Sequence, residues 1–515
     1  MNMIKLLDCT LRDGGYYTDW DFDKSLVDSY CQAMNRLPIE YIEVGYRSID
    51  LKGYHGEYYY CPISLLTELK KLLPNKKLTI ILNEKDIKPE HVITLLKPCI
   101  PFISLVRIAV DPVNFKRALL LSKEIKKLGF EVGFNLMYLS DWDEKSEFIN
   151  YLEFIDNKDL DYLYMVDSYG GVMVDKLEKM ASVFRSKTNI PLGFHGHNNI
   201  EMALTNSIFA LNNGFKIIDA TILGMGRGAG NLKMELFLIY LNKLYNLNLD
   251  FDELSKVCAE FDKLKKIHKW GTSLPYIFSG IHSLPQKEVM ELVGMERFPL
   301  DIVISSLKNN FSKKPHLKFP ILNFNKESEQ VFIIGGGPSL NKISKYLHSY
   351  FNKNSEIVIV HTGLKYVNEF KDLVNKQYYC LTGFEGEKID VAFNNSLIDN
   401  KKFIFYPSPR IMGQNTPEWI NKNAFEIEKL SFFKNKNYST LLLGLQVAFN
   451  YNPKNIYIAG FDGYEYSTSP LKLKLTQENQ IIFDEFQDHF TGNLLSITKT
   501  MYIGLELTSI YNKID

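Results

Sequence analysis

The sequence predicts an α/β protein of two domains, a (β/α)8 barrel followed by a smaller Rossmann-like sheet. Eight short β-branched runs alternate with helix-like segments over the first 245 or so residues, and polar residues gather where these runs end. A Lys-, Pro- and Asn-rich break then precedes a second α/β pattern. We expect the barrel at residues 1–250, a helical extension at 251–318, a linker at 319–330 and the second domain at 331–515.

The eight expected barrel strands are, in order, IKLLDCT, YIEVGY, LTIIL, SLVRIAV, EVGFNLMYL, DYLYMVDS, PLGFHGHN and IIDATILGMG. Helix-like segments such as 114–129 and 201–214 lie between them, and each ends in Gly, a common helix C-cap. Eight such units fit a closed barrel, and a doubly wound open sheet is the alternative. In the second domain, VFII, EIVIV, KFIFY and NIYIAG are the expected buried strands.

Composition excludes several classes of protein. A chain of 515 residues with 45% hydrophobic content suggests more than one core. Sixty basic residues balance sixty acidic ones, so no net field favours nucleic acid or a membrane surface. Six cysteines without a CxxC pair, no signal-peptide pattern and no apolar run long enough to span a membrane predict a reduced, cytoplasmic protein.

Polar residues follow or end most of the expected barrel strands. Active sites of barrels lie at these carboxyl ends, and buried polar groups without partners are costly, so the rim is expected to bind something. The residues are Asp8, Arg12, Asp13, Glu43, Arg107, Asp167, Ser168, His195, His197 and Asn231.

The pair His195 and His197 points to a metal. Residues two apart on a strand face the same way, so both imidazoles would join Asp13 at one place. One carboxylate and two imidazoles suit a divalent cation, with Mn²⁺ first and Mg²⁺, Co²⁺ or Zn²⁺ as alternatives; we also expect Asn231 in the metal's set. A partnered polar rim without metal is the other interpretation. Arg12 can clamp a carboxylate and stabilise an enolate, or simply pair with acidic neighbours.

These motifs carry a resemblance. LLDCTLRDGG, FHGHNN and GMGRGAGN resemble the metal-dependent barrel lyases that include isopropylmalate synthase, hydroxymethylglutaryl-CoA lyase and 4-hydroxy-2-oxovalerate aldolase. Residues 3 to about 310 are most similar to the last of these. The resemblance implies an enzyme that makes or cleaves a C–C bond through a pyruvate enolate, with an aldehyde as partner and a tendency to form homo-oligomers. It implies metal ligands Asp13, His195 and His197, and a 2-oxo acid bound by Arg12 and Ser168.

The expected site has further members and one departure from the family pattern. Arg107 is expected to bind substrate, and Glu43 to act with Arg12 in catalysis. The resemblance further implies a catalytic Tyr in a helical segment beyond the barrel, and GTSLPYIFSGIHS resembles that segment with Tyr276 as the nearest candidate. The family's catalytic base is a His shortly after the R-D-G motif, but Tyr16 stands there in RDGGYYTDW. A neutral Tyr is a poor base near pH 7, so Tyr16 acts with a lowered pKa or through water, or another residue replaces it. His55 and His282 are the candidate replacements.

The second domain resembles bacterial sialyltransferase-like enzymes and a domain of flagellin-glycosylation proteins, through FIIGGGPSL and NIYIAGFDGYEYS. This implies a nucleotide-sugar at Gly335, Gly337, Ser339 and Asp462, with His489 as a polar or basic group. A plain strand–turn–helix without ligand is the alternative. Together the two resemblances suggest a pyruvate-extended sugar for a surface polysaccharide. An acetyl-CoA-dependent Claisen acyltransferase and a non-catalytic scaffold with a decayed barrel are the competing functions.

Overall fold

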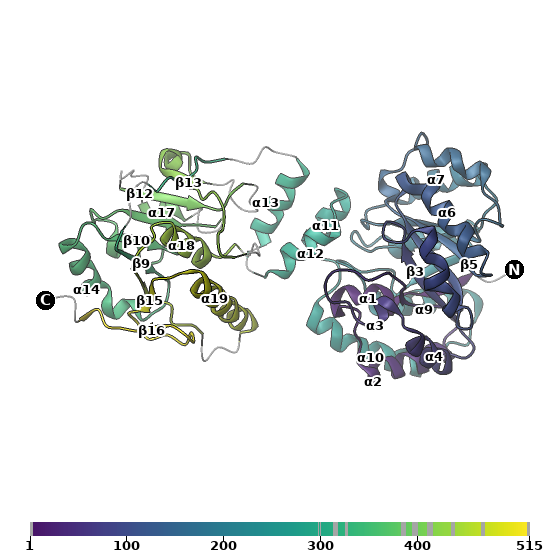
Figure 1. The fold of residues 1–515 in the computed structure, drawn as a ribbon. Helices are drawn as coiled ribbons and strands as arrows, with labels where there is room; N and C mark the ends of the chain where they lie inside the picture. The colour runs from purple at the N-terminus through teal and green to yellow at the C-terminus, as the bar shows by residue number, and fades with distance from the viewer. Residues whose placement is uncertain are drawn as a thin grey trace. The chain divides into compact units, whose positions relative to one another are not determined.

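The chain forms two compact units, Met1–Gly294 and Met295–Asp515 (Figure 1). The computed structural model describes residues 4–511, apart from 297, 299, 313–317, 325–327, 383–387, 394–399, 409–415, 434–437 and 465–468. Within these residues, none of the helices combines the length and the apolar character that a membrane crossing requires.

The first unit is a closed barrel of eight parallel strands, which confirms the predicted fold over an open sheet. Each strand pairs with the next, and the eighth returns to the first, with Lys5 opposite Ile217 and Asp8 opposite Ala220. The strands are β1 (Lys5–Asp8), β2 (Tyr41–Tyr46), β3 (Lys77–Asn83), β4 (Ile103–Val110), β5 (Glu131–Leu136), β6 (Tyr162–Asp167), β7 (Leu192–Gly196) and β8 (Ile217–Ala220).

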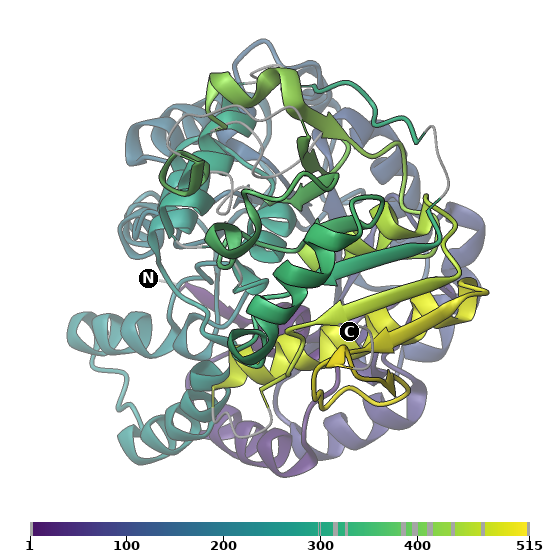
Figure 2. The same cartoon turned by 90° about the vertical axis from the view of Figure 1, so that its left-hand side faces the viewer.

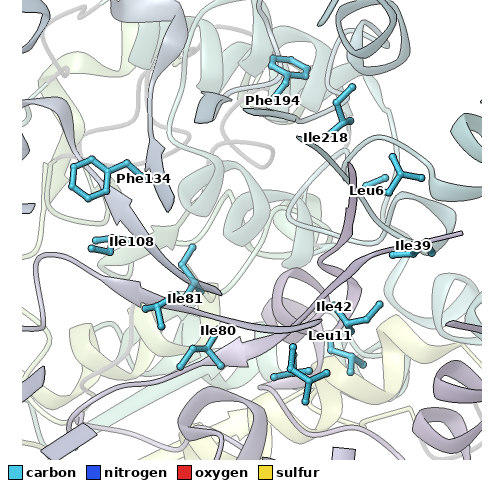
Figure 3. Packing of buried hydrophobic residues seen from close by; sticks show 14 of the residues in the cluster. Leu6, Leu11, Ile39, Ile42, Ile80, Ile81, Ile108, Phe134, Phe194 and Ile218 are labelled. Atoms are coloured by element: carbon cyan, nitrogen blue, oxygen red, sulfur yellow. The ribbon is translucent and has the colours of Figure 1, made fainter. Parts of the chain in front are cut away.

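Helices surround the barrel and bury the outward side chains of its strands. The main ones are α2 (Lys24–Arg36), α4 (Ile63–Leu72), α5 (Val92–Leu96), α6 (Phe115–Lys126), α7 (Val174–Lys187), α8 (Ala203–Asn212), α9 (Met234–Tyr245) and α10 (Phe251–His268). Leu6, Ile42, Ile108 and Phe194 belong to this outer core (Figure 3). Each such side chain contributes roughly 1.5–3 kcal/mol when fully buried. The predicted helices at 114–129 and 201–214 correspond to α6 and α8.

The alternation of side chains along the strands decides which residues face the barrel interior. Leu7, Tyr41, Leu105 and Tyr164 form a separate inner cluster, next in sequence to outward residues such as Leu6 and Ile42. Three charged residues lie two positions from members of this inner cluster, and His195 follows the outward Phe194, so these four side chains also point inward: Glu43, Arg107, His195 and Asp219. The pattern therefore sends several charged side chains into one enclosed space.

One local expectation at the first strand is wrong. We expected Arg12 and Asp13 at the end of a strand, but β1 ends at Asp8 and helix α1 (Thr10–Thr18) begins two residues later. Asp13 lies in the first turn of α1, where the helix dipole favours a carboxylate. The indole N–H of Trp20 donates to the carbonyl oxygen of Arg12 at 3.0 Å and so ties the chain after α1 back to the site.

Two further helices complete the first unit, α11 (Leu274–Ile281) and α12 (Gln286–Gly294); α3 (Glu57–Tyr60) is a single short turn between β2 and α4. The helix α13 (Leu300–Phe311) belongs to the second unit.

The second unit is built on a parallel sheet (Figure 2). Its strand order is β13-β12-β11-β10-β9-β14-β15-β16, which confirms the predicted Rossmann-like α/β class. Its strands are β9 (Gln330–Ile334), β10 (Val358–His361), β11 (Gln377–Cys380), β12 (Lys401–Phe405), β13 (Ala424–Glu426), β14 (Asn455–Ala459), β15 (Asn493–Ser496) and β16 (Glu506–Leu507). The four predicted strands correspond to β9, β10, β12 and β14.

Helices cover both faces of this sheet. The helices α14 (Leu340–Lys353) and α15 (Val367–Phe370) share one apolar cluster with Phe332 and Ile359 of the strands. The helices α18 (Thr440–Phe449) and α19 (Pro470–His489) share another with Ile333 and Val360. A short helix, α17 (Ile389–Phe393), packs beside β11 and β12. The unit is therefore a three-layer α/β/α structure.

Candidate active site

A network of buried charges lies inside the barrel. Arg107 donates to Glu43 at 2.7 and 2.5 Å and to Asp219 at 2.5 Å. Arg12 donates to the same Glu43 at 2.7 Å and to Asp13 at 2.5 Å. Removing one member of such a network leaves an uncompensated buried charge, which typically destabilises a protein by about 3–5 kcal/mol. The network therefore fixes Arg12 and Asp13 rigidly.

The two predicted histidines are oriented by their Nδ1 atoms. His195, on β7, donates from Nδ1 to Oδ2 of Asp219 at 2.8 Å, because a carboxylate can only accept. His197, one residue past β7, donates from Nδ1 to the backbone oxygen of Asp167 at 2.7 Å. Both imidazoles therefore leave the lone pair of Nε2 free, as in metal sites where an outer partner fixes the tautomer. Sequence reasoning missed Asp219, whose inward position on β8 is the signal that could have found it.

The donor set fits a divalent cation. One ligand atom each from Asp13, His195 and His197 lies within 4.8 Å of the others, and all three residues are buried. Nε2 of His197 and Oδ1 of Asn231 are buried without a partner, while the amide of Asn231 donates to Asp13 Oδ2 at 2.5 Å. Unpartnered buried acceptors are costly, and a cation between them would satisfy both.

A second group of possible ligands overlaps the first. Cys9, His195 and Asp219 meet the same spacing. Here, however, His195 and Asp219 already bond each other, and the Cys9 thiol donates to the carbonyl oxygen of Ala220 at 3.7 Å. Burial also raises the pKa of Cys9 well above its usual range, which opposes the thiolate that a metal prefers. The Asp13 group is the better site.

The electrostatics of the site keep Asp13 and His197 in the forms that bind metal. Burial, with a further contribution from His195, lowers the pKa of His197 to about 3, so its imidazole is neutral. Burial alone would raise the pKa of Asp13, but Arg12 and then His195 outweigh it, and the pKa falls below its ordinary range. A metal requires this combination, an ionised carboxylate and neutral imidazoles.

A cavity of about 580 Å³ adjoins His195 and His197, whereas Asp13 and Asn231 lie behind its lining. Arg12, Ser168, His195 and His197 line it, and so does Tyr16. The Tyr16 hydroxyl lies 3.0 Å from the hydroxyl of Tyr46, and the Arg227 guanidinium lies 4.5 Å from the centre of the Tyr16 ring.

Comparisons with known proteins agree with this geometry. Residues 106–260 match the model of the HMGL-like family. The chain is 27% identical over 270 residues to a 4-hydroxy-2-oxovalerate aldolase of Bacillus cereus, covering 50% of this chain and 75% of the relative. It is 24% identical over 290 residues to an oxaloacetate decarboxylase of Mycobacterium tuberculosis, covering 56% and 84%. The crystal structure of "the N-terminal domain of a putative aldolase from Bacteroides vulgatus" is 49% identical with a TM-score of 0.56, covering 59% of this chain and 100% of that one. The N-terminal unit belongs to the HMGL-like family.

The HMGL-like barrel does not bring every expected residue to the cavity. Glu43 and Arg107 are both 0% exposed. They lie in the barrel interior and do not line the cavity. Tyr276, on α11, is 6% exposed and also lies outside the lining, and burial raises its pKa to about 12.

Of the three candidate bases, Tyr16 lines the cavity, whereas His55 and His282 do not. His55 packs against Tyr59, and His282 packs against Phe278. Ser168 lies at the cavity, and its hydroxyl oxygen accepts from the backbone N–H of Tyr138 at 2.8 Å.

A hollow of about 570 Å³ lies in the second unit, where the strand order reverses between β9 and β14. Gly337 and Asp462 line it. The N–H groups of Gly335, Gly337 and Ser339 are all used within the fold, on Ala459, Gly460 and Asp462 respectively. The three-glycine turn thus serves close packing of two loops, because a Cβ at Gly335 would lie 2.6 Å from the Gly460 oxygen. His489, at the end of α19, is exposed and lies outside the lining.

Proposed function

We propose that the HMGL-like barrel is a divalent-metal-dependent carbon–carbon lyase that makes or cleaves a bond to C3 of pyruvate through the enolate. The observation that carries this is the buried set of Asp13, His195 and His197, with Nε2 of His197 unpartnered at the floor of a cavity that Arg12 also lines. Mn²⁺ is the cation we expect first, with Mg²⁺, Co²⁺ and Zn²⁺ as alternatives.

The reactions that the names of the relatives describe support a 2-oxo acid as the substrate. Cleavage of 4-hydroxy-2-oxovalerate by an aldolase and loss of CO₂ from oxaloacetate both break the bond between C3 and C4 of a 2-oxo acid. In both reactions the electron pair stays on C3, which leaves the enolate of pyruvate. The names of these two relatives give no comparable support to the competing function, an acetyl-CoA-dependent acyltransferase.

Each of the side chains at the cavity would have a different role in this reaction. A bound cation would act as a Lewis acid on the oxygen atoms of the 2-oxo acid. Arg12, held by Glu43 and Asp13, would place its positive charge beside the oxygen on which enolate charge develops. Ser168 would hold the carboxylate. Tyr16, at the cavity, would move the C3 proton directly or through water, in place of the family's His.

Proton exchange at C3 of pyruvate tests this function without knowledge of the second substrate. We expect the full chain to exchange these protons in D₂O, followed by NMR, only when Mn²⁺ is present. His195→Ala should lower the rate by about 100-fold or more, since it removes a ligand. His348→Ala, which removes an imidazole of the second unit, is the matched control. Absence of exchange in metal-loaded protein would overturn the proposal.

We further propose that the second unit binds a nucleotide-sugar and that both units serve one surface-polysaccharide pathway. The support is the hollow between β9 and β14, since ligands of open α/β sheets bind where strand order reverses. Because the turn's N–H groups at Gly335, Gly337 and Ser339 are occupied, side chains such as Lys365 would contact the phosphates. Equilibrium dialysis of the full chain and of Lys365→Ala with UDP- and CMP-linked sugars tests this; absence of binding would contradict it.

A further inference from the structure

The cavity above the metal ligands is larger than pyruvate and a small aldehyde require. Pyruvate and acetaldehyde together have nine non-hydrogen atoms, and at roughly 30 Å³ for each water-sized group they fill on the order of 270 Å³. The cavity measures about 580 Å³. About half of it therefore remains for the rest of a longer substrate.

A second hollow of about 590 Å³ adjoins this cavity. Asp111, Tyr138 and Tyr169 line both spaces, so they form the boundary between them. The rings of Tyr138 and Tyr169 lie 5.5 Å apart at a tilt of 32°. An extended molecule reacting at the metal ligands could pass these two rings and enter the second hollow.

Tyr138 is held at this boundary under strain. Its φ angle is 65°, in the left-handed region that a bulky residue rarely adopts. Its N–H donates to the hydroxyl of Ser168, which ties it to the catalytic cavity. Such conformations persist only where the surrounding structure enforces them, and they concentrate at functional sites.

The polar groups along this route suit hydroxyls. Oδ1 of Asn135, a residue 4% exposed that lines the catalytic cavity, is buried without a partner. Asp111 accepts one backbone bond, from Val113, and has further acceptor capacity. Farther along, Trp142 offers an aromatic wall and Asp141 a carboxylate. Aromatic faces beside hydroxyl acceptors bind the CH and OH groups of a polyol.

We propose that the second hollow is the acceptor subsite of the barrel, and that the acceptor is an unphosphorylated polyhydroxylated aldehyde, an open-chain sugar. This inference rests on the proposed pyruvate chemistry and names its second substrate. The reaction is an aldol addition. Pyruvate loses a C3 proton, its C3 bonds to the aldehyde carbon as the C=O π bond breaks, and the new alkoxide takes up a proton. The product is a 4-hydroxy-2-oxo acid longer by three carbons.

The charges of the hollow argue against a phosphorylated acceptor. Among its described lining residues, Asp111, Asp141 and Glu147 are carboxylates and Lys116 is a cation, which gives a net charge of −2. Lys116 is also occupied, since it lies over the Tyr151 ring at 4.6 Å and near Glu147 at 4.0 Å. A terminal phosphate in this hollow would meet repulsion rather than a counter-ion.

A panel of aldehydes tests the inference. The full chain with Mn²⁺ and pyruvate would be supplied with acetaldehyde, glyceraldehyde, erythrose, arabinose and erythrose 4-phosphate, and the 2-oxo acid products quantified. We expect kcat/KM for erythrose or arabinose to exceed that for acetaldehyde by about tenfold or more, and that for erythrose 4-phosphate to be lower than for erythrose. A preference for acetaldehyde or for the phosphorylated sugar would overturn the inference.

Two variants test residues at the boundary between the catalytic cavity and the second hollow. Asp111→Asn preserves an acceptor for Val113 but removes the negative charge, and Tyr169→Ala removes one of the shared rings. Each should lower the ratio of kcat/KM for erythrose to that for acetaldehyde by about tenfold, whereas Tyr54→Ala, at an exposed tyrosine outside both spaces, should leave the ratio unchanged. An unchanged ratio in both variants would contradict the subsite.

Different results would contradict the proposed function and this inference. If pyruvate does not exchange its C3 protons in metal-loaded protein, the lyase chemistry itself is wrong. If pyruvate exchanges normally but sugar aldehydes are no better than acetaldehyde, only the acceptor subsite is wrong.

Discussion

Asp219 is the residue on which the geometry of the site depends most. It accepts from Nδ1 of His195 and from Arg107, so it fixes an imidazole and balances a buried guanidinium at once. Asp219→Asn keeps the size of the side chain but removes the charge. We expect the Mn²⁺ affinity of the full chain, measured by isothermal titration calorimetry, to fall about 10- to 100-fold.

Asp8→Asn is the matched control, because Asp8 is also a buried carboxylate of the barrel but faces Tyr30 of α2 instead of the site. Equal losses of Mn²⁺ affinity in Asp219→Asn and Asp8→Asn would show that barrel destabilisation, not the orientation of His195, explains the effect.

Asp8 also gives a prediction about pH. Burial raises its pKa from 3.8 to about 6, against the lowering effect of hydrogen bonds from Tyr30 and Thr10. Between about pH 4 and pH 6 the folded state therefore holds a proton that the unfolded state has lost, so this group's contribution to stability falls as the pH rises. The full effect is about 3 kcal/mol.

Asp8→Asn cannot ionise, and we expect its free energy of unfolding to rise relative to that of the natural protein between pH 4 and pH 7, by up to about 3 kcal/mol. Urea unfolding at both pH values measures this difference. A difference that stays constant with pH would mean that Asp8 keeps an ordinary pKa in the fold.

Part of the site could be predicted residue by residue. The spacing of His195 and His197 on a buried strand predicts that they point together, and their rings do lie 5.0 Å apart. The depths of Glu43 and Arg107 could not be predicted, because position along a strand does not reveal how far down the barrel a side chain lies. That depends on strand tilt and register between strands distant in sequence.

Among the elements, α1 bears most directly on the site. An added Cβ at Gly15 would lie 2.1 Å from the Trp20 ring, whose indole N–H holds the Arg12 carbonyl. We expect Gly15→Ala to displace Trp20 and to destabilise the barrel by about 1–3 kcal/mol in thermal or urea unfolding. Gly294→Ala, at a glycine where an added Cβ meets no atom within 4 Å, is the control. Equal stabilities of Gly15→Ala and Gly294→Ala would contradict the close packing of Gly15 on Trp20.

The elements also show where sequence patterns stop being informative. The barrel strands are predictable because each lies in a short run of buried, mainly apolar residues. Helix α1 is not, since two glycines at positions 14 and 15 favour a turn over a helix. The missed strands β11, β13, β15 and β16 have two to four residues each, too few for a period to be recognised.

Taken as a whole, the molecule combines two independent cores. The HMGL-like barrel contains the candidate metal ligands and the cavity and gives the matches to known enzymes, and the Bacteroides domain covers 59% of the chain. The second unit contributes a separate sheet and a separate hollow. The break in composition predicted a linker at 319–330 after a helical extension of the barrel, whereas the contacts divide the chain after Gly294, so that α13 belongs to the second unit. The order of β9 and β14, which creates the hollow of the second unit, follows from pairing between distant segments and is invisible in the sequence.

The proposed function requires that Asp13, His195 and His197 hold a cation to which pyruvate binds. Pulsed electron paramagnetic resonance of the Mn²⁺-loaded full chain with ¹³C-labelled pyruvate tests it most directly. We expect ¹⁴N couplings from two imidazoles, the loss of one in each of His195→Ala and His197→Ala, and a ¹³C coupling that arises only when pyruvate is added. Unchanged ¹⁴N couplings in both variants, or no ¹³C coupling at saturating pyruvate, would contradict the account.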